Sequence, residues 1–515
     1  MRKSNEHANK CRDEGNKLYS TRNFFDALLK YNESLCYALD ESVSALAYAN
    51  RSAVYFEIKL YEHCLTNIEF AKLNKYPEKN AHILLSRSEK CVALMNRDSD
   101  KHRQLPENLS CFTKLSYKEN SQMPFIVDCL ELRTNDVFGR HIVTTRDLKV
   151  GDMLTFEEPY FKVIKSDSRY ESCQELNKYQ RCAACLRDNL MDLIPCKKCI
   201  STMYCSQKCL EYADRNFHNY ECNINETLLK AGIMQMVMRV FFQSLNIFNG
   251  SIDELEKFLN DCTKTSTCVY DFDFSTTDEH KLAKSYLLSS YNLARNEAVT
   301  SDESSHSIFM LDPLLIELWD SHSIFITKFI KRFIKIYDSN FHGICGWSVK
   351  KSENYEAQMI GVGCYCFSSL INHSCSPCIN RLYSYDKLII VVDRPIKKGE
   401  QLFDCYRSPF FKQSKSERQY SLLNEYAFRC QCEACVKNYP LFHSLKSFNK
   451  KLLKYAKKSK NEIQKLDFVE AQRKFQEICS IIQDSKEYPS SEIILLQECV
   501  QQCLSIILKP KNLIL

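Results

Sequence analysis

The chain has 515 residues, of which 44% are apolar, and this length and composition support several packed domains. No stretch approaches the roughly eighteen uninterrupted apolar residues of a membrane-spanning helix. The 70 basic and 64 acidic residues leave a net charge of +6, which over this length indicates mostly solvated surface. We therefore expect no membrane association and no DNA binding.

The cysteine content indicates a reducing compartment. The chain has 28 cysteines, and it opens with MRKSNEHANKCRDEGN, which is charged and lacks the apolar run of a secretory signal. In the nucleus and the cytoplasm, where we expect this protein, cysteines are usually metal ligands or buried thiols. A disulfide framework is the less favoured alternative.

Residues 1–100 are predicted to form TPR-like helical repeats. Small and large residues recur at the spacing of a helix pair in Gly15, Leu18, Phe24, Ala27 and Tyr31. The pattern returns 37 residues later in Ser52, Tyr55, Tyr61, Cys64, Ile68 and Ala71. A partial third repeat covers 81–94. The alternative is an amphipathic helical cap without a binding role.

Beyond the polar stretch at 96–124, the apolar period changes from helical to alternating. Strands are predicted at 126–132, 142–145 and 153–156, and another at 388–393. The sequence at 147–152 is similar to that at 394–400, and each is predicted to be the end of a strand followed by a turn that contains glycine. We interpret this as one β domain interrupted by two insertions, followed by a C-terminal helical domain with a break at Pro489.

The first insertion contains eight potential metal ligands within forty-one residues. Their spacings are C-x2-C, C-x2-C, C-x3-C and H-x3-C, which is enough for two closed tetrahedral zinc sites. A module this short needs metal to fold, and each bound zinc would contribute on the order of 10 kcal/mol to the folding free energy. The alternative is a run of buried or free cysteines. The ligands are Cys182, Cys185, Cys196, Cys199, Cys205, Cys209, His218 and Cys222.

A second group of cysteines follows the β domain. Cys430, Cys432 and Cys435 supply three thiolates, and a closed zinc site requires a fourth ligand. The alternative is that they are small buried hydrophobic residues.

The motifs together resemble a known family. The eight-ligand insertion resembles a MYND finger, which implies that Cys182, Cys185, Cys205 and Cys209 hold one zinc, and Cys196, Cys199, His218 and Cys222 the other. The phrase Asn372-His373-Ser374-Cys375, the Gly399-Glu400 phrase ending at Tyr406 and the C-x-C-x2-C tail resemble a SET domain. The whole chain is similar to the SMYD family of protein lysine methyltransferases, in the member-four-like branch with N-terminal TPR-like repeats.

This resemblance implies an α+β multidomain fold, in which a β-rich SET domain is split by a MYND zinc finger and a helical insert and flanked by helical segments. The implied divisions are 1–100 for the TPR-like repeats, 125–180 for the first SET half, 181–222 for the MYND finger, 223–340 for the helical insert, 341–410 for the second SET half, 411–436 for the post-SET zinc segment and 437–515 for the C-terminal helices.

The resemblance also implies the ligands and the active site. Cys375 would be the fourth ligand of a third zinc, with Cys430, Cys432 and Cys435. S-adenosylmethionine would contact Gly139, Arg140, Asn340, Ser369, Asn372, His373, Tyr406 and Phe428. Tyr406 would be catalytic, and Tyr426 would line the channel for the substrate lysine. From the residues alone, Phe428 is better explained as a core aromatic.

The implied function is S-adenosylmethionine-dependent protein-lysine N-methyltransfer to a histone or another protein. The finger would bind proline-containing peptides and, with the helical arms, recruit chromatin or corepressor partners to a monomeric enzyme. The alternative is an adaptor or transcriptional corepressor with a silent pocket. Five residues depart from the family pattern: Phe138, His141, His342, Asp404 and Arg407.

Overall fold

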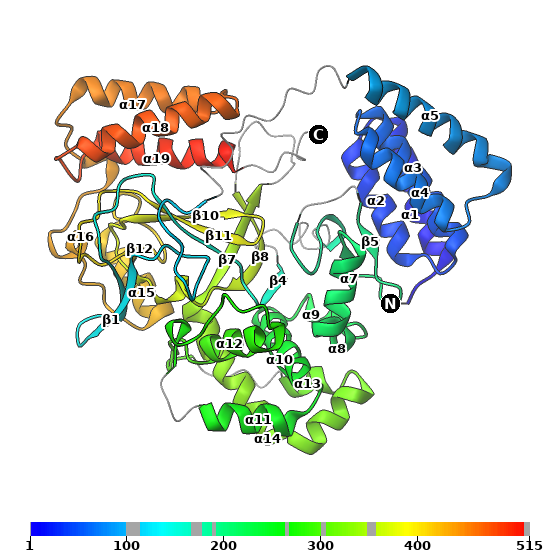
Figure 1. The fold of residues 1–515 in the computed structure, drawn as a ribbon, viewed down its shortest axis with the longest axis horizontal. Helices are drawn as coiled ribbons and strands as arrows, with labels where there is room; N and C mark the ends of the chain where they lie inside the picture. The colour runs from blue at the N-terminus through cyan, green and yellow to red at the C-terminus, as the bar shows by residue number, and fades with distance from the viewer. Residues whose placement is uncertain are drawn as a thin grey trace.

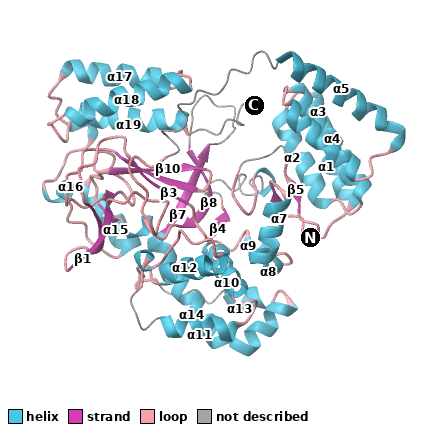
Figure 2. Ribbon diagram, in the orientation of Figure 1, coloured by secondary structure: helices cyan, strands magenta, loops and turns pink. Residues whose placement is uncertain are grey.

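The computed structural model describes residues 2–98, 114–165, 178–187, 192–262, 267–299, 305–347 and 357–508. N-terminal helices form one side of the molecule, a group of short sheets lies centrally, and a C-terminal helical bundle packs on the opposite side (Figures 1 and 2). None of the helices in the described ranges is long and apolar enough to cross a membrane.

Five α-helices and one 3-10 turn occupy the region where the repeats are predicted. Gly15 on the first helix faces Tyr31 on the second, and a Cβ at Gly15 would lie 2.5 Å from the Tyr31 ring. A side chain larger than glycine's hydrogen would therefore separate these helices. The elements are α1 (Asn5–Ser20), α2 (Phe24–Tyr37), α3 (Glu41–Glu57), α4 (Tyr61–Leu73), η1 (Glu78–Asn80) and α5 (Ala81–Asp98). Their classification as TPR-like repeats stays a prediction.

The cysteine-rich finger shares a hydrophobic core with these helices. Asn32 on α2 donates from Nδ2 to the carbonyl of Tyr179 at 2.8 Å, and Arg51 on α3 donates to the carbonyl of Leu193 at 2.7 Å. The finger contains β5 (Ile194–Pro195), β6 (Met203–Tyr204), α7 (Gln207–Ala213), the π-helical turn η4 (Asp214–His218) and α8 (Asn219–Glu221).

Segments distant in sequence form the central sheets. Strand β3 (Met153–Glu157) pairs antiparallel with β11 (Lys387–Val392), and β4 (Lys162–Ile164) pairs with β8 (Ala357–Cys364). The two halves therefore build one β domain across the insertions, as predicted. The remaining strands are β1 (Leu130–Asn135), β2 (Gly139–Thr144), β7 (Phe341–Trp347), β9 (Asn372–His373), β10 (Ile379–Ser384) and β12 (Phe403–Asp404).

The strand predicted at 126–132 is wrong at its start, because regular pairing begins only at Leu130. Ile126 closes a turn by donating its N–H to the carbonyl of Met123 at 3.0 Å. Ile126 and Val127 still form isolated bridges with Thr155 and Glu119, so this segment follows the sheet without forming a continuous strand. The similar sequences at 147–152 and 394–400 pair with each other through Leu148 and Ile396.

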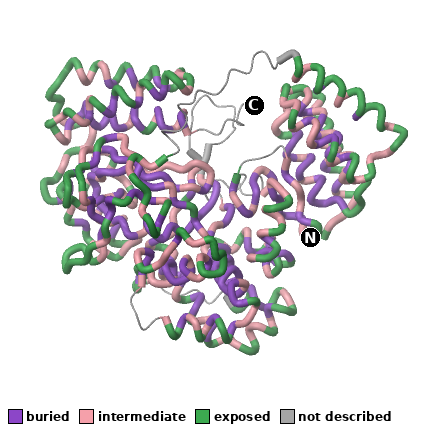
Figure 3. Tube along the Cα trace, viewed as in Figure 1, coloured by how far each residue is buried: buried purple, intermediate pink, exposed green. Residues whose placement is uncertain are grey.

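Helices fill the second insertion and the C-terminal region. Core residues of the final bundle pack against Met153 of β3 and against Ile389 and Val391 of β11, which fixes the bundle to the β domain. In Figure 3 the buried residues cluster in the interior of these layers. The elements are α9 (Asn225–Leu228), α10 (Ile233–Ile247), α11 (Ile252–Cys262), η5 (Val269–Asp271), α12 (Glu279–Tyr291), α13 (Ser305–Phe309), α14 (Pro313–Asn340), η6 (Ser368–Leu370), α15 (Lys415–Tyr426), α16 (Glu433–Val436), η7 (Phe442–Ser444), α17 (Lys450–Ile463), α18 (Phe468–Asp484) and α19 (Ser491–Ile507).

Candidate active site

The tail cysteines converge on Cys375, although 55 residues separate it from Cys430. The Cys375 Sγ lies 3.6 Å from that of Cys435 and 4.0 Å from that of Cys430, and the Cys375 N–H donates to the Cys432 Sγ at 3.3 Å. Zinc–sulfur bonds of about 2.3 Å in a tetrahedron place sulfurs about 3.8 Å apart. These four thiols therefore fit one closed metal site, which would hold the tail segment against the β domain.

The eight ligands of the finger separate into two sets of four, and within each set the ligand atoms lie within 4.8 Å of one another. The first set is Cys182, Cys185, Cys205 and Cys209, and the second is Cys196, Cys199, His218 and Cys222. This is the alternating partition that the motif resemblance implies. The sulfur separations again suit tetrahedral zinc, for example 3.6 Å between Cys185 and Cys205 and 3.8 Å between Cys196 and Cys222.

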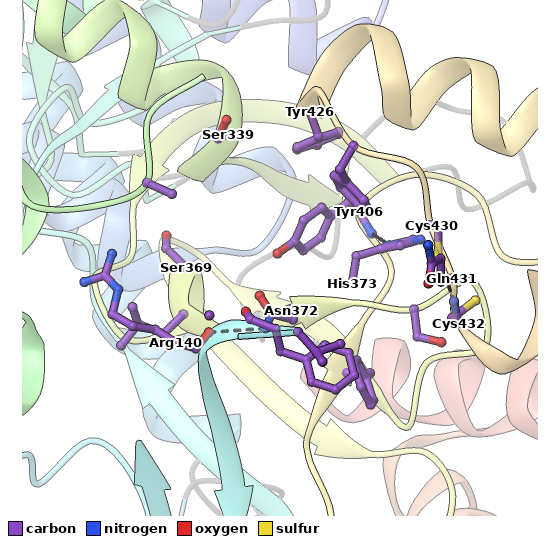
Figure 4. Close-up of a pocket in the computed structure, with 18 of the residues that line it drawn as sticks. Arg140, Ser339, Ser369, Asn372, His373, Tyr406, Tyr426, Cys430, Gln431 and Cys432 are labelled. Carbon is purple, nitrogen blue, oxygen red and sulfur yellow. Dashed lines mark hydrogen bonds between the residues drawn. The ribbon is translucent and has the colours of Figure 1, made fainter. Parts of the chain in front are cut away.

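A cavity of about 880 Å³ lies between the two halves of the β domain and the tail segment (Figure 4). This volume is in the range of ligand-binding pockets. All nine predicted cofactor and channel residues line it, and they come from the β1–β2 hairpin, the end of α14, the segment around β9 and the tail. They are Gly139, Arg140, Asn340, Ser369, Asn372, His373, Tyr406, Tyr426 and Phe428. Their individual roles stay predictions.

Asn372 ties the second half of the β domain to the hairpin of the first half. Its Nδ2 donates to the carbonyl of Phe138 at 3.1 Å and to the carbonyl of Arg140 at 3.2 Å, as the dashed line in Figure 4 shows for Arg140. Gly139 lies between them with φ of +61°, a conformation that favours glycine. Asn372 therefore helps to hold the backbone of the hairpin where it borders the cavity.

Asn340 and Ser369 form a second polar wall of the cavity. Asn340 ends α14, and its Nδ2 donates to the carbonyl of Ala294 at 2.6 Å. Ser369 Oγ donates to the Asn340 carbonyl at 2.9 Å. The end of α14 and the loop before β9 are therefore fixed to each other beside the cavity.

The loop that carries Ser369 is anchored by Glu157 at the end of β3. The buried carboxylate accepts the N–H of Phe367 at 2.8 Å, and it accepts the N–H and the hydroxyl of Ser368 at 2.9 and 2.7 Å. Burial raises the pKa of Glu157 to about 7, although these donors favour the charged form. Glu157 thus places η6, and through it Ser369, from below the cavity.

We expect Glu157→Gln to lower the free energy of unfolding by about 3 kcal/mol at pH 5, since the new amide group would face backbone donors. A raised pKa means that Glu157 stabilises the fold most below its ordinary pKa and loses this contribution as pH rises through 7. The gap between wild type and variant should therefore narrow by about 2 kcal/mol between pH 5 and pH 8. Urea unfolding at both pH values measures the difference in free energy of unfolding between wild type and variant. A difference that widens as pH rises would refute the raised pKa of Glu157.

His373 connects the catalytic candidate to the tail metal site. Its Nδ1 accepts the backbone N–H of Tyr406 at 3.0 Å, and its Nε2 lies 3.4 Å from the Sγ of Cys375. Burial lowers the pKa of His373 to about 4, so the ring is neutral and the remaining proton is on Nε2. The position of Tyr406 consequently depends on a residue that contacts the metal-ligand set.

Tyr406, Tyr426 and Phe428 form an aromatic group at one end of the cavity. The Tyr406 and Tyr426 ring centroids are 5.0 Å apart, and those of Tyr406 and Phe428 are 6.5 Å apart at 87°. The Tyr406 hydroxyl donates to the carbonyl of Ile371 at 3.0 Å. Burial, and then the charge of Asp404, raises the pKa of Tyr406 above its ordinary value, so its hydroxyl stays protonated.

Sequence reasoning missed a buried polar chain behind this group. Arg381 on β10 donates from Nε to the Asp404 carboxylate at 2.8 Å and contacts His342 Nδ1, while His342 Nε2 lies 3.4 Å from Ser369 Oγ. Burial and the Arg381 charge lower the pKa of His342, so the ring is neutral. The polar departures at His342 and Asp404 were the available signal, but nothing in the sequence identified Arg381 as their shared partner.

Two other residues that depart from the family pattern also form specific contacts. His141 Nδ1 is 2.9 Å from the carbonyl of Gly139, so this side chain supports the hairpin where a second glycine was expected. Arg407, which directly follows Tyr406, forms an ion pair with Glu425 on α15. Both interactions add side-chain support to backbone that borders the cavity.

Strand β2 of the hairpin, the segment around β9 and the segment that ends at Tyr406 fall within one family model, which matches the SET domain over residues 139–407. This match covers more than half of the chain, and the chain belongs to the SET domain family.

Among curated relatives, the chain is similar to the protein-lysine N-methyltransferase SMYD4 of Pongo abelii and of Homo sapiens. Each is 22% identical over 536 residues, which cover 82% of this chain and 66% of the relative. It is also similar to the histone-lysine N-methyltransferase SMYD3 of Homo sapiens, at 24% identity over 304 residues that cover 58% of this chain and 59% of the relative. These matches confirm the predicted resemblance to the SMYD family. The chain spans about two thirds of the length of its SMYD4 relatives.

Proposed function

We propose that this protein is an S-adenosylmethionine-dependent protein-lysine N-methyltransferase. The observation that carries the proposal is the single cavity in which the residues matched to the SET motifs meet, although they lie between Gly139 and Phe428 in sequence. The SET domain match and the methyltransferase relatives support the same reaction class.

The cavity suits S-adenosylmethionine in size and chemistry. A pocket of about 880 Å³ can take a nucleoside with an amino-acid tail, and Asn340, Ser369 and Asn372 provide polar groups along one side. Phe428 provides an aromatic face for a base, and Gly139 lets backbone approach closely. The cofactor would supply an electrophilic methyl group on a sulfonium, and the protein would supply binding and alignment.

The protein's own residues can then orient the acceptor amine. Tyr406 and Tyr426 would flank the lysine side chain, with the Tyr406 hydroxyl and the carbonyl of Ile371 marking the point of transfer. A neutral amine is the nucleophile, and a narrow channel that excludes water lowers the pKa of a lysine. Because little bond chemistry is left to the protein, alignment and electrostatics account for most of the catalysis.

The Arg381–Asp404 ion pair lies behind the tyrosines and does not itself line the cavity. Asp404 is 8% exposed and Arg381 is 23% exposed, so the pair is largely shielded from solvent. We propose that the pair fixes the backbone before Tyr406, since Asp404 Oδ1 also accepts the N–H of Cys405 at 2.7 Å. Through His342, the same pair reaches Ser369 on the cofactor side.

The three four-ligand groups are proposed to bind one zinc ion each, because their spacing suits closed tetrahedral sites. The two ions of the finger would be structural. The third would hold the tail with Phe428 against the cavity. We propose that the MYND-type finger and the TPR-like helices recruit proline-containing peptides and chromatin or corepressor proteins, and that the protein acts as a monomer in nucleus and cytoplasm.

An adaptor with a silent pocket is the second candidate function. It is favoured by the departures at His342 and Asp404, which with Arg381 place a polar chain behind the tyrosines. The presence of Asn372, His373, Tyr406 and Phe428 in one cavity favours the enzyme.

Titration calorimetry with S-adenosylmethionine tests the cofactor assignment. Wild type should bind, and Asn372→Ala should bind roughly 30-fold more weakly, because loss of two hydrogen bonds to the hairpin costs about 2 kcal/mol. Asn461→Ala, which changes an exposed asparagine on α17, is the matched control and should bind like wild type. Equal affinity in all three proteins would show that the hairpin does not contact the cofactor.

A further inference from the structure

Helix α17 concentrates positive charge that the balanced composition of the whole chain conceals. Residues 446–465 contain eight lysines and one acidic residue, Glu462. The two other helices of the same bundle have the opposite balance, with five acidic and two basic residues. These are Glu470, Glu477, Asp484, Glu492 and Glu498 against Arg473 and Lys474. Charge is therefore segregated within one small bundle, whereas ordinary solvated surfaces intersperse the two signs.

Five of the lysines form one face of α17, which we call the lysine face: Lys450, Lys451, Lys454, Lys457 and Lys458. All five are exposed. At 3.6 residues per turn they fall within an arc of about 120° and extend over about 12 Å. The opposite side of the helix, with Ala456 and Ile463, is buried in the bundle core. Figure 1 shows α17 at the outer edge of the bundle, on the side away from the β domain.

The lysine face lowers the stability of the helix that carries it. Lys450 and Lys451 occupy the first turn of α17, where the helix dipole disfavours cations, and this turn contains no acidic residue. Among ion pairs of the described residues, only Lys458 of the five takes part, with Glu462 at 3.6 Å. Four unpaired cations on one face repel one another, and an external polyanion would relieve this repulsion.

We propose that the lysine face of α17 is a docking surface for the phosphate backbone of duplex DNA. One strand of a B-form duplex carries one phosphate charge per about 3.4 Å of helix axis, so a stripe of about 12 Å along it matches roughly four charges. Lysine acts as a point charge without directional selectivity, which suits contacts that do not depend on sequence. This surface departs from the expectation based on net charge, because that charge averages over the acidic helices beside it.

The same features disfavour other polyanionic partners. An anionic membrane also attracts clustered lysines, but stable binding of a helix in its surface adds insertion of an apolar face, and that side of α17 is already buried in the bundle core. Single-stranded nucleic acid is bound by successive bases stacked on several aromatic rings together with charge, whereas the exposed aromatic residue beside the lysine face is the single Phe448, at 55% exposed. The regularly spaced phosphates of a rigid duplex can be bound by an ordered row of cations without apolar or stacking contacts.

Fluorescence anisotropy with a labelled duplex DNA of about 20 base pairs tests the proposal on the full, zinc-loaded chain. The test variant combines Lys450→Gln, Lys451→Gln, Lys454→Gln and Lys457→Gln. We expect its affinity at 100 mM salt to be at least about tenfold weaker than that of wild type. The slope of log affinity against log salt should become shallower by about 3 to 4, because each phosphate contact contributes about 0.9.

A matched control removes four exposed lysines from the N-terminal helices, as Lys10→Gln, Lys17→Gln, Lys79→Gln and Lys90→Gln. It carries the same net charge as the test variant and should bind DNA like wild type. Equal binding by test and control variants would overturn the proposal, and so would a wild type that does not bind the duplex. Tighter binding to duplex RNA or to phosphatidylserine vesicles than to DNA would also overturn it. Because no outcome depends on methyl transfer, the test is independent of the proposed enzymatic function.

Discussion

Replacing Tyr406 with phenylalanine is expected to lower methyl transfer by about 100- to 1,000-fold while the fold and cofactor binding stay intact. The hydroxyl lies at the cavity end where Tyr406, Tyr426 and the carbonyl of Ile371 meet. Removing one oriented polar group at a site of transfer typically has an effect of this size. The phenyl ring keeps the packing against His373 and Phe428, so only the polar contribution is lost.

Radiolabelled methyl transfer to proteins of a cell extract measures this loss, and calorimetry with S-adenosylmethionine shows that the pocket is preserved. Tyr420→Phe on α15 is the matched control, because its side chain is 72% exposed and does not line the cavity. Its activity should equal that of wild type. Activity in Tyr406→Phe equal to that of Tyr420→Phe would remove Tyr406 from the reaction.

Replacing Cys432 with serine is expected to reduce tightly bound zinc from three ions per chain to two and to abolish activity. A structural zinc supplies folding free energy on the order of 10 kcal/mol, and without it the tail segment loses its attachment to Cys375. Release of the tail would displace Phe428 from the His373 ring, and it would also disturb the contact between His373 and Cys375. A displaced binding wall should reduce turnover by about 100-fold or more.

Zinc content by mass spectrometry of the metal and melting temperature separate this effect from global unfolding. The two ions of the finger should remain, because no ligand of the finger belongs to the tail cluster. Cys262→Ser is the control, since Cys262 is a partly buried thiol outside the three clusters. A Cys432→Ser protein that retains three ions, or that retains full activity, would show that the tail cluster does not shape the cavity.

Ligand spacing carried the most reliable information in the sequence. The four ligand pairs of the finger separate in space as their spacing and resemblance imply, because coordination geometry allows few arrangements of thiols. The echo of a glycine turn at Gly151 and Gly399 likewise corresponded to one β domain, in which Leu148 and Ile396 pair directly. Motifs with steric or coordination requirements therefore translate into structure with little ambiguity.

Contacts between residues distant in sequence, and the exact bounds of a buried strand, could not be derived from the sequence in the same way. The strand predicted at 126–132 is regular only from Leu130, because apolar alternation reports burial and cannot distinguish a continuous strand from a turn that makes isolated bridges. Arg381 is one charged residue within an ordinary strand pattern, and only the fold brings it to Asp404 and His342. The anchoring of η6 by Glu157 likewise joins residues more than 200 positions apart.

A screen for methyl transfer tests the central claim most directly. The zinc-loaded 515-residue chain is incubated with S-adenosylmethionine that carries a labelled methyl group and with cell extract, and the labelled proteins are hydrolysed to amino acids. We predict that label appears as methyl-lysine and that Tyr406→Phe removes it. If S-adenosylmethionine binds but no lysine is labelled, or if label appears on another residue type, the assignment of this cavity to lysine methylation is wrong.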